Sequence, residues 1–107
     1  MIETHHRYKK DAPSGTALYL AEALRESDTE FVGEYQGERK DHQIGMDAVR
    51  GGGVFGEHEV RFISDHEELS FSHRALDRKL FASGSLVLMS WLIGQSSGFY
   101  HFKDVDL

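Results

Sequence analysis

Residues 57–74 read EHEVRFISDHEELSFSHR, and two alternating runs within this stretch decide the fold class. Both runs alternate apolar or aromatic side chains with polar ones, which is the period of a half-buried strand. The side chains on the apolar side are Val60 and Phe62 in the first run and Leu69, Phe71 and His73 in the second. Residues 64–66 (SDH) separate the runs, so 57–63 and 68–74 are predicted to form a hairpin.

Further strands are predicted upstream of this hairpin. Residues 44–50 have the composition of a strand, and the three glycines at 51–53 end it and permit a turn or bulge. Residues 2–6 read as the end of another strand. Residues 31–42 are polar and weakly patterned, so we expect a loop there with at most one irregular strand.

Two helices are predicted, one after the first strand and one after the hairpin. Residues 14–16 (SGT) open the first helix, because Ser and Thr are favoured at the N-cap, and we place its end within 26–28. The second helix is expected over 77–93, with Gly94 as its stop. Its apolar face consists of Leu80, Gly84, Val87, Leu88 and Trp91.

This order of elements predicts an α+β fold, with a mixed sheet of about four strands and two main helices packed on one face. We expect residues 1–107 to form a single domain, since the length suffices for one modest core.

The composition is that of an ordinary soluble globular domain, with 39% hydrophobic and 28% charged residues. The chain lacks an apolar run long enough for a transmembrane helix and the features of a signal peptide, so a cytoplasmic location is expected. With no cysteine, disulfides and thiolate chemistry are excluded. The net charge of −6 argues against nucleic acid as a partner.

The charge is unevenly distributed along the chain. Residues 1–16 sum to +1 and the remainder to −7, without any charge on histidine. The charged residues in the first segment are Arg7, Lys9 and Lys10 against Glu3 and Asp11. A basic island on an acidic protein is typical of a small-anion site, and a solvated loop is the alternative.

The segment 3–17, of sequence ETHHRYKKDAPSGTA, combines two imidazoles, three cations and a helix start. A helix N-terminus offers unpaired N–H groups and a partial positive charge, which bind carboxylate or phosphate readily. Imidazole moves protons near neutral pH, and a lysine nearby binds an anion or stabilises developing negative charge. The segment therefore predicts an anion site with acid–base chemistry.

Other interpretations of these residues stay open at this point. His5 and His6 could bind a metal, although adjacent strand residues point to opposite faces and we predict no metal site. Ser14 as a nucleophile would need a base and an orienting acid that the spacing does not show. His5 could equally be a structural histidine, and Ser14 or Thr16 only a helix cap.

Four stretches resemble dihydrodipicolinate reductase (4-hydroxy-tetrahydrodipicolinate reductase), an enzyme of the diaminopimelate route to lysine. They are ETHHRYKKDAPSGTA at 3–17, IGMDAVRGGGVFGEHEVRF at 44–62, SHRALDRKLFASGS at 72–85 and SWL at 90–92. The resemblance covers most of the chain and is weakest over 26–41. The chain is similar to the C-terminal domain of that family, so we expect the N-terminal nucleotide-binding domain to be absent from this chain.

The resemblance implies a role for each residue that matches the family motifs. It implies that His5 is the proton donor, that Lys9 is the second catalytic group and that His6 contacts the substrate. Three residues match the loop that holds a substrate carboxylate, and two match positions near the cofactor. The first set is Ser14, Gly15 and Thr16, and the second is Arg78 and Phe81.

The implied reaction transfers hydride from NADH or NADPH to an unsaturated cyclic dicarboxylate, and the implied assembly is a homotetramer. No G-x-G-x-x-G follows a strand here, so the cofactor is expected to bind mainly to the missing domain, and this domain is expected to be inactive alone. No membrane partner is expected. The alternatives are a non-catalytic dicarboxylate-binding module and a pure oligomerisation module.

The sequence departs from the family pattern at a few positions outside segment 3–17. Gly53 stands where the family usually has Asp, Ser85 stands where it usually has Ala, and 86–89 is bulkier than usual. These departures concern local packing.

Overall fold

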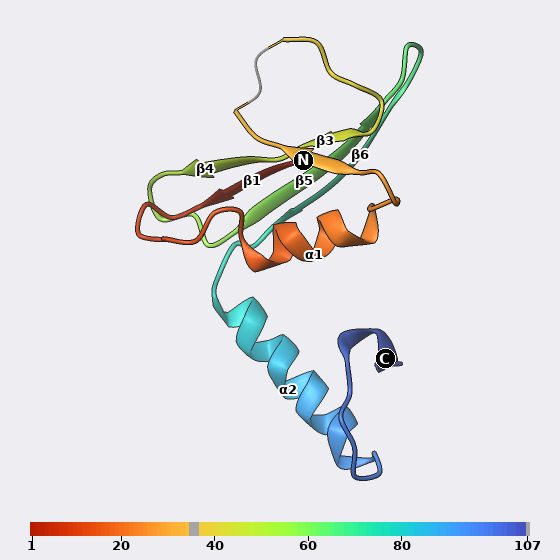
Figure 1. The fold of residues 1–107 in the computed structure, drawn as a ribbon. Helices are drawn as coiled ribbons and strands as arrows, with labels where there is room; N and C mark the ends of the chain where they lie inside the picture. Colours follow the sequence, from red (N-terminus) through yellow and green to blue (C-terminus); the bar gives the residue numbers. More distant parts are fainter. Residues whose placement is uncertain (35–36, 107) are drawn as a thin grey trace. The chain divides into compact units, whose positions relative to one another are not determined.

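The computed structural model describes residues 1–34 and 37–106 (Figure 1). Its contacts divide the chain into two compact units, Met1–Ala75 and Leu76–Leu107, which are described separately below. The expectation of a single domain over 1–107 stays a prediction.

A four-stranded mixed sheet forms the first unit, in the order β4-β1-β5-β6. Its strands are β1 (Ile2–His5), β4 (Asp47–Arg50), β5 (Glu57–Ile63) and β6 (Glu68–Arg74). Strand β1 pairs in parallel with β4 and antiparallel with β5, and β5 pairs antiparallel with β6. The structure confirms the α+β class and the mixed sheet of four strands.

The hairpin β5–β6 has the predicted boundaries. Its register places Val60 opposite Phe71 and Phe62 opposite Leu69, so the apolar side chains of both strands share one face. The rings of Phe62 and Phe71 meet edge to face, with centroids 6.3 Å apart. Strict alternation explains the accuracy of this prediction, because a register slip would move these side chains to the polar face.

Helix α1 (Gly15–Ala23) lies across one face of the sheet in the first unit (Figure 1). It buries Ala17 and Ala21. The predicted end within 26–28 is wrong, because the helix ends at Ala23. Its C-cap is Leu24, whose N–H donates to the carbonyl of Ala21 and tightens the last turn.

The predicted strand over 44–50 is also wrong as a single element. Its first part, β3 (Gln43–Gly45), pairs in parallel with β2 (Glu30–Val32) in a separate two-stranded sheet, whereas its second part is β4. Met46 lies between the two sheets, and its N–H donates to the carbonyl of Val32 over 2.8 Å. The chain therefore changes sheets at this buried residue.

The core of the first unit is small. Its buried apolar residues in the central cluster are Ala17, Ala21 and Met46, against which Met1, Phe31 and Ile44 pack. Gly33 is required in this region, because a Cβ there would lie 2.8 Å from the carbonyl oxygen of Met46.

The second unit contains helix α2 (Lys79–Ile93) and the 3-10 helix Phe102–Asp104. The helix starts two residues later than predicted, since Asp77 accepts the N–H of Lys79 with its side chain, and it ends at Gly94 as predicted. Within this unit Trp91 donates to Asp106 over 2.7 Å. The packing of both helices on one sheet face is confirmed for α1, and for α2 it stays a prediction.

Among the described residues, no helix is both long and apolar enough to span a bilayer.

Candidate active site

The predicted catalytic segment begins on β1, where alternate side chains point to the face covered by α1. Glu3 and His5 share this face and are 1% and 9% exposed. Residue Glu3 pairs in register with His58 of β5, which is also buried. A carboxylate and two imidazoles therefore gather under the start of α1, where a purely apolar layer would otherwise be expected.

The carboxylate of Glu3 joins four segments of the chain. Its Oε1 accepts the backbone N–H of Ser14 over 3.1 Å and a guanidinium N–H of Arg50 over 2.7 Å. Its Oε2 lies 2.6 Å from Nδ1 of His5 and 3.9 Å from Nε2 of His58. Because Ser14 and His5 both contact this one carboxylate, the predicted proton donor lies close to the helix start.

The environment lowers the pKa of both members of this contact. Burial alone would raise the pKa of Glu3, but hydrogen bonds from Arg50 and Ser14 outweigh burial and hold it below its usual range. Burial lowers the pKa of His5, and the neighbouring Glu3 opposes this only in part. At neutral pH Glu3 is therefore ionised and His5 is mainly neutral.

His58 connects this pair to the helix. Its Nε2 lies 3.0 Å from Oγ of Ser14, and its ring meets the ring of His5 edge to face, with centroids 5.1 Å apart. Burial lowers the pKa of His58, and the neighbouring His5 lowers it further. A neutral His58 can donate to the Ser14 hydroxyl, which itself accepts the N–H of Ala17.

The predicted second catalytic group, Lys9, is already paired with a carboxylate. Its ammonium contacts both carboxylate oxygens of Asp11 at 2.9 and 2.8 Å, and this pairing lowers the pKa of Asp11. The positive charge of Lys9 also contributes to the lowered pKa of His5. A substrate anion that binds Lys9 would therefore compete with Asp11.

The helix start offers open backbone at two of its three predicted residues. Ser14 is buried, and its N–H and hydroxyl are already engaged by Glu3, Ala17 and His58. Gly15 and Thr16 are exposed, and a Cβ added at Gly15 would meet nothing within 4 Å. An anion can therefore approach the backbone at Gly15 and Thr16.

The structure places the remaining predicted residues elsewhere. His6 follows β1 and lies with its ring centroid 6.3 Å from that of Tyr8. Its Nδ1 is buried without a hydrogen-bond partner among the described residues. Arg78 is the N-cap of α2 and Phe81 is exposed on that helix, so both belong to the second unit and are not brought to the site by any described contact.

The donor atoms of Glu3, His5 and His58 all lie within 4.8 Å of one another, which would suit a metal ion. However, Arg50 already occupies one oxygen of Glu3, and His5 lies at hydrogen-bond distance from the other. We therefore interpret Glu3 as the acceptor of Arg50 and Ser14 and not as a metal ligand, because a guanidinium on the carboxylate opposes a second cation there.

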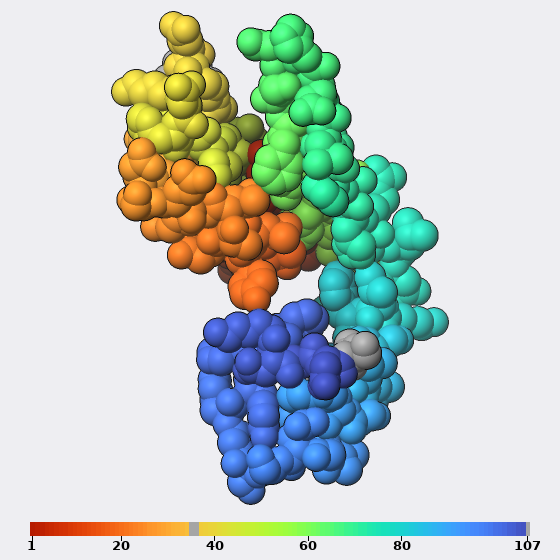
Figure 2. All heavy atoms as spheres, turned by 90° about the vertical axis from the view of Figure 1, so that its right-hand side faces the viewer, coloured from red at the N-terminus to blue at the C-terminus, as the bar shows by residue number. Residues whose placement is uncertain are grey.

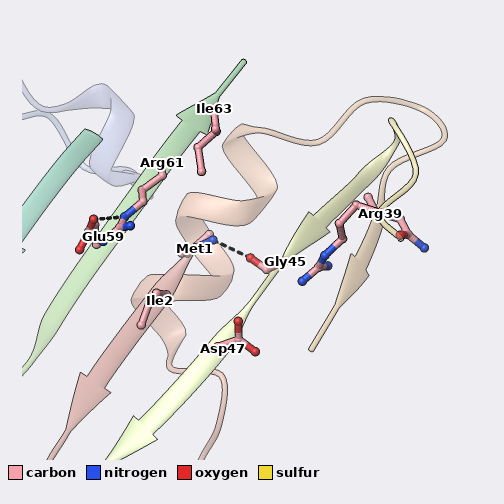
Figure 3. Close-up of a pocket in the computed structure, with 9 residues that line it drawn as sticks. Met1, Ile2, Arg39, Gly45, Asp47, Glu59, Arg61 and Ile63 are labelled. Carbon is pink, nitrogen blue, oxygen red and sulfur yellow. Dashed lines mark hydrogen bonds and ion pairs between the residues drawn. The ribbon is translucent and has the colours of Figure 1, made fainter. Parts of the chain in front are cut away.

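Two hollows of the first unit lie at the other end of β1. One, with a volume of about 450 Å³, is lined by Met1, Ile2, Arg39, Gln43, Gly45, Asp47, Glu59, Arg61 and Ile63 (Figure 3). A neighbouring one of about 280 Å³ lies between β3 and β5, and Figure 2 shows it as a groove between the yellow and green atoms. Met1, which lines both hollows, precedes His5 by four positions, or about 13 Å along an extended strand.

A family model described as "Dihydrodipicolinate reductase, C-terminus" matches residues 1–105. The chain belongs to this family. The match confirms the resemblance carried by the motifs at 3–17 and 44–62, and it spans both units of the structure.

Relatives named 4-hydroxy-tetrahydrodipicolinate reductase are similar over nearly the whole chain. The protein from Methanospirillum hungatei is 43% identical over 98% of this chain, and that from Haloarcula marismortui is 47% identical over 98%. The chain spans only 42% and 43% of their lengths. A solved structure, dipicolinate-bound dihydrodipicolinate reductase from Paenisporosarcina sp. TG-14, is also similar. The match covers 97% of this chain and 43% of the solved chain, with a TM-score of 0.72 and 24% sequence identity. This likeness supports the fold.

Sequence reasoning missed four residues of the site, namely Glu3, Asp11, Arg50 and His58. For Glu3 a signal was present, because it lies two positions before His5 and so shares its face of the strand. Asp11 was counted only as a charge. Arg50 and His58 come from other strands, and only the sheet pairing brings them to β1.

Proposed function

We propose that this chain is the substrate-binding and proton-donating domain of a 4-hydroxy-tetrahydrodipicolinate reductase, an oxidoreductase of lysine biosynthesis through diaminopimelate. The family match and the names of its relatives support this proposal. The observation that carries the chemistry is the buried contact between Glu3 and His5, which the N–H of Ser14 ties to an open helix start.

The proposed substrate is a small cyclic dicarboxylate. The solved Paenisporosarcina protein is described as dipicolinate-bound, and dipicolinate is such a molecule. One carboxylate would bind the exposed backbone at Gly15 and Thr16, where the positive end of α1 favours an anion. The other would bind near Lys9 and His6.

His5 is proposed to deliver a proton to the substrate from Nε2, because its Nδ1 faces Glu3. Burial holds the pKa of the free His5 low, and two substrate carboxylates nearby would raise it. Substrate binding would therefore bring the proton onto His5 just before it is needed. Lys9 would stabilise the negative charge that develops on the substrate.

The hydride would come from NADH or NADPH, and the described residues do not build a site for either. The glycines at 51–53 lie in the turn between β4 and β5, whereas a dinucleotide pyrophosphate needs a glycine-rich turn from strand to helix. We therefore derive no step through the cofactor and propose that a nucleotide-binding domain outside this chain holds it.

The proposed setting is a cytoplasmic homotetramer without nucleic acid or membrane partners. The net charge of −6 disfavours nucleic acid. Apolar side chains on β5 and β6 support self-association, because Phe62, Leu69 and Phe71 are about half exposed.

The test is reductase turnover in the complete protein with His5→Ala and Lys9→Ala. Each substitution should reduce kcat by roughly 10²–10⁴-fold, as expected for a positioned acid–base group. His66→Ala, in the exposed turn of the hairpin, is the control and should retain full activity. Turnover within twofold of wild type for both site variants would leave the non-catalytic dicarboxylate-binding module as the better interpretation.

A further inference from the structure

We propose that Glu3 is a positioning residue that fixes the tautomer of His5, so that Nδ1 carries the hydrogen and Nε2 is the nitrogen that exchanges a proton with the substrate. This inference rests on the proposed function, because it assumes that His5 is the proton donor.

The contact between the two side chains is short and buried. Oε2 of Glu3 lies 2.6 Å from Nδ1 of His5, and the two residues are 1% and 9% exposed. An ionised carboxylate can only accept a hydrogen bond. Neither atom has a hydrogen-bond partner of regular geometry among the described residues, so the 2.6 Å approach itself is the observation. A lone pair on Nδ1 would be repelled by the ionised oxygen at this distance. We therefore expect Nδ1 to carry the hydrogen, which leaves the lone pair of neutral His5 on Nε2.

The orientation of Glu3 is set independently of His5. Arg50 and the backbone N–H of Ser14 both donate to Oε1, at 2.7 and 3.1 Å. These two donors fix the carboxylate and outweigh burial, so the pKa of Glu3 stays below its usual range. The Glu3 side chain is thus an ionised acceptor whose second oxygen faces His5.

A glycine lies against the Nε2 side of the imidazole. A Cβ at Gly56 would lie 3.2 Å from Nε2 of His5, so a side chain there would press on the proposed proton-donating atom. The charged or titratable groups that act on His5 are Glu3, Lys9, Arg50 and His58. Of these, only Glu3 favours the protonated ring.

The first test measures the tautomer of His5 directly in the wild-type protein, and a variant serves only to assign the signals. Histidine-selective ¹⁵N NMR of the complete protein reports which ring nitrogen of His5 carries the hydrogen, and His5→Gln assigns its signals. We expect neutral His5 to be protonated at Nδ1. A neutral His5 protonated at Nε2 would overturn the proposal.

The second test is Glu3→Gln in the complete protein, with Glu59→Gln as the matched control. Glu59 is also a strand carboxylate paired with an arginine, Arg61, but it lies on the opposite face of the sheet. We expect Glu3→Gln to lower kcat at least tenfold, to change the substrate KM less than threefold and to mix the His5 tautomers. The control should retain wild-type values.

Several outcomes would decide against the proposal. A folded Glu3→Gln protein with unchanged kcat and an unchanged His5 tautomer would overturn the proposal. So would stoichiometric binding of Zn²⁺ by the wild-type protein that Glu3→Gln loses, since Glu3, His5 and His58 would then form a metal site. If Glu3→Gln does not fold, the wild-type NMR result decides alone. His5→Ala distinguishes a failure of the proposed function from a failure of this inference. An active His5→Ala protein contradicts the proposed function, whichever tautomer His5 adopts.

Discussion

At the scale of single residues, Glu3 stabilises the fold as well as the site. Its carboxylate is buried, and its loss would leave the N–H of Ser14 without an acceptor and would remove the only carboxylate that is paired with Arg50 among the described residues. Breaking a buried ion pair by removing one partner costs about 3–5 kcal/mol. Because the core cluster contains three buried apolar side chains among the described residues, such a loss is large for this unit.

The lowered pKa values in this network predict that the fold is sensitive to acid. Glu3, His5 and His58 all bind protons less readily in the folded state, so the unfolded chain takes up more protons as the pH falls. The free energy of unfolding should therefore decrease below the ordinary histidine pKa of 6.5, and further below the ordinary glutamate pKa of 4.5.

Urea unfolding between pH 7.5 and 4 checks this expectation. His58→Gln should reduce the proton uptake on unfolding by up to about one proton, while the amide can still contact Ser14. His66→Gln in the exposed turn is the control. A stability that stays constant or rises on acidification would contradict the lowered pKa values.

At the scale of elements, a substitution at the start of α1 can distinguish an anion-binding site from a simple helix cap. Gly15→Val fills an open position, so as a cap variant it should change stability by a few tenths of a kcal/mol. If a carboxylate must approach this backbone, the valine should raise the substrate KM at least tenfold in the complete protein and leave cofactor affinity unchanged.

The matched control for Gly15→Val is Gly53→Val, which also fills open space, in the turn where the resembled family usually has Asp. Steady-state kinetics with both variants makes the comparison. An unchanged substrate KM in Gly15→Val would remove the helix start from the binding site.

Met46 is the residue on which the two sheets and α1 meet. It is 9% exposed and packs in one cluster with Ala17 and Ala21. Met46→Ala should reduce the free energy of unfolding by about 2–4 kcal/mol, measured by urea titration. Met89→Ala, at an exposed position of α2, is the control. A loss below 1 kcal/mol would show that Met46 is not part of the core.

The same residue shows why part of the fold could be read from the sequence and part could not. Strict alternation at 57–63 and 68–74 predicted both strands of the hairpin with correct ends. At 44–50 the composition is also that of a strand, but the change of sheet at Met46 depends on Val32, fourteen positions earlier. Local patterns do not contain such a tertiary contact.

The candidate active site could likewise be predicted only in part from the sequence. The motif at 3–17 supplied His5, Lys9 and the helix start, since these residues are contiguous. The partners that orient them, Arg50 and His58, lie about fifty residues downstream and reach the site only through the pairing of β1 with β4 and β5. The roles assigned to Arg78 and Phe81 stay predictions.

At the scale of the whole molecule, the exposed apolar side chains predict self-association. In the first unit Phe62, Ile63, Leu69 and Phe71 are each at least 45% exposed. We expect a tetramer at micromolar concentration by analytical ultracentrifugation. The association should persist in 0.5 M NaCl, about the regime where exposed charge pairs are screened. A monomer at these concentrations would contradict the prediction.

The bond between the N–H of Ser14 and Glu3 has a consequence for hydrogen–deuterium exchange. First-turn amides of a helix usually exchange quickly because they lack an acceptor within the helix. The Ser14 amide should instead be protected, because its acceptor is a buried carboxylate. Its exchange rate then reports how often Glu3 releases the helix start, and therefore how often His5 loses its orientation.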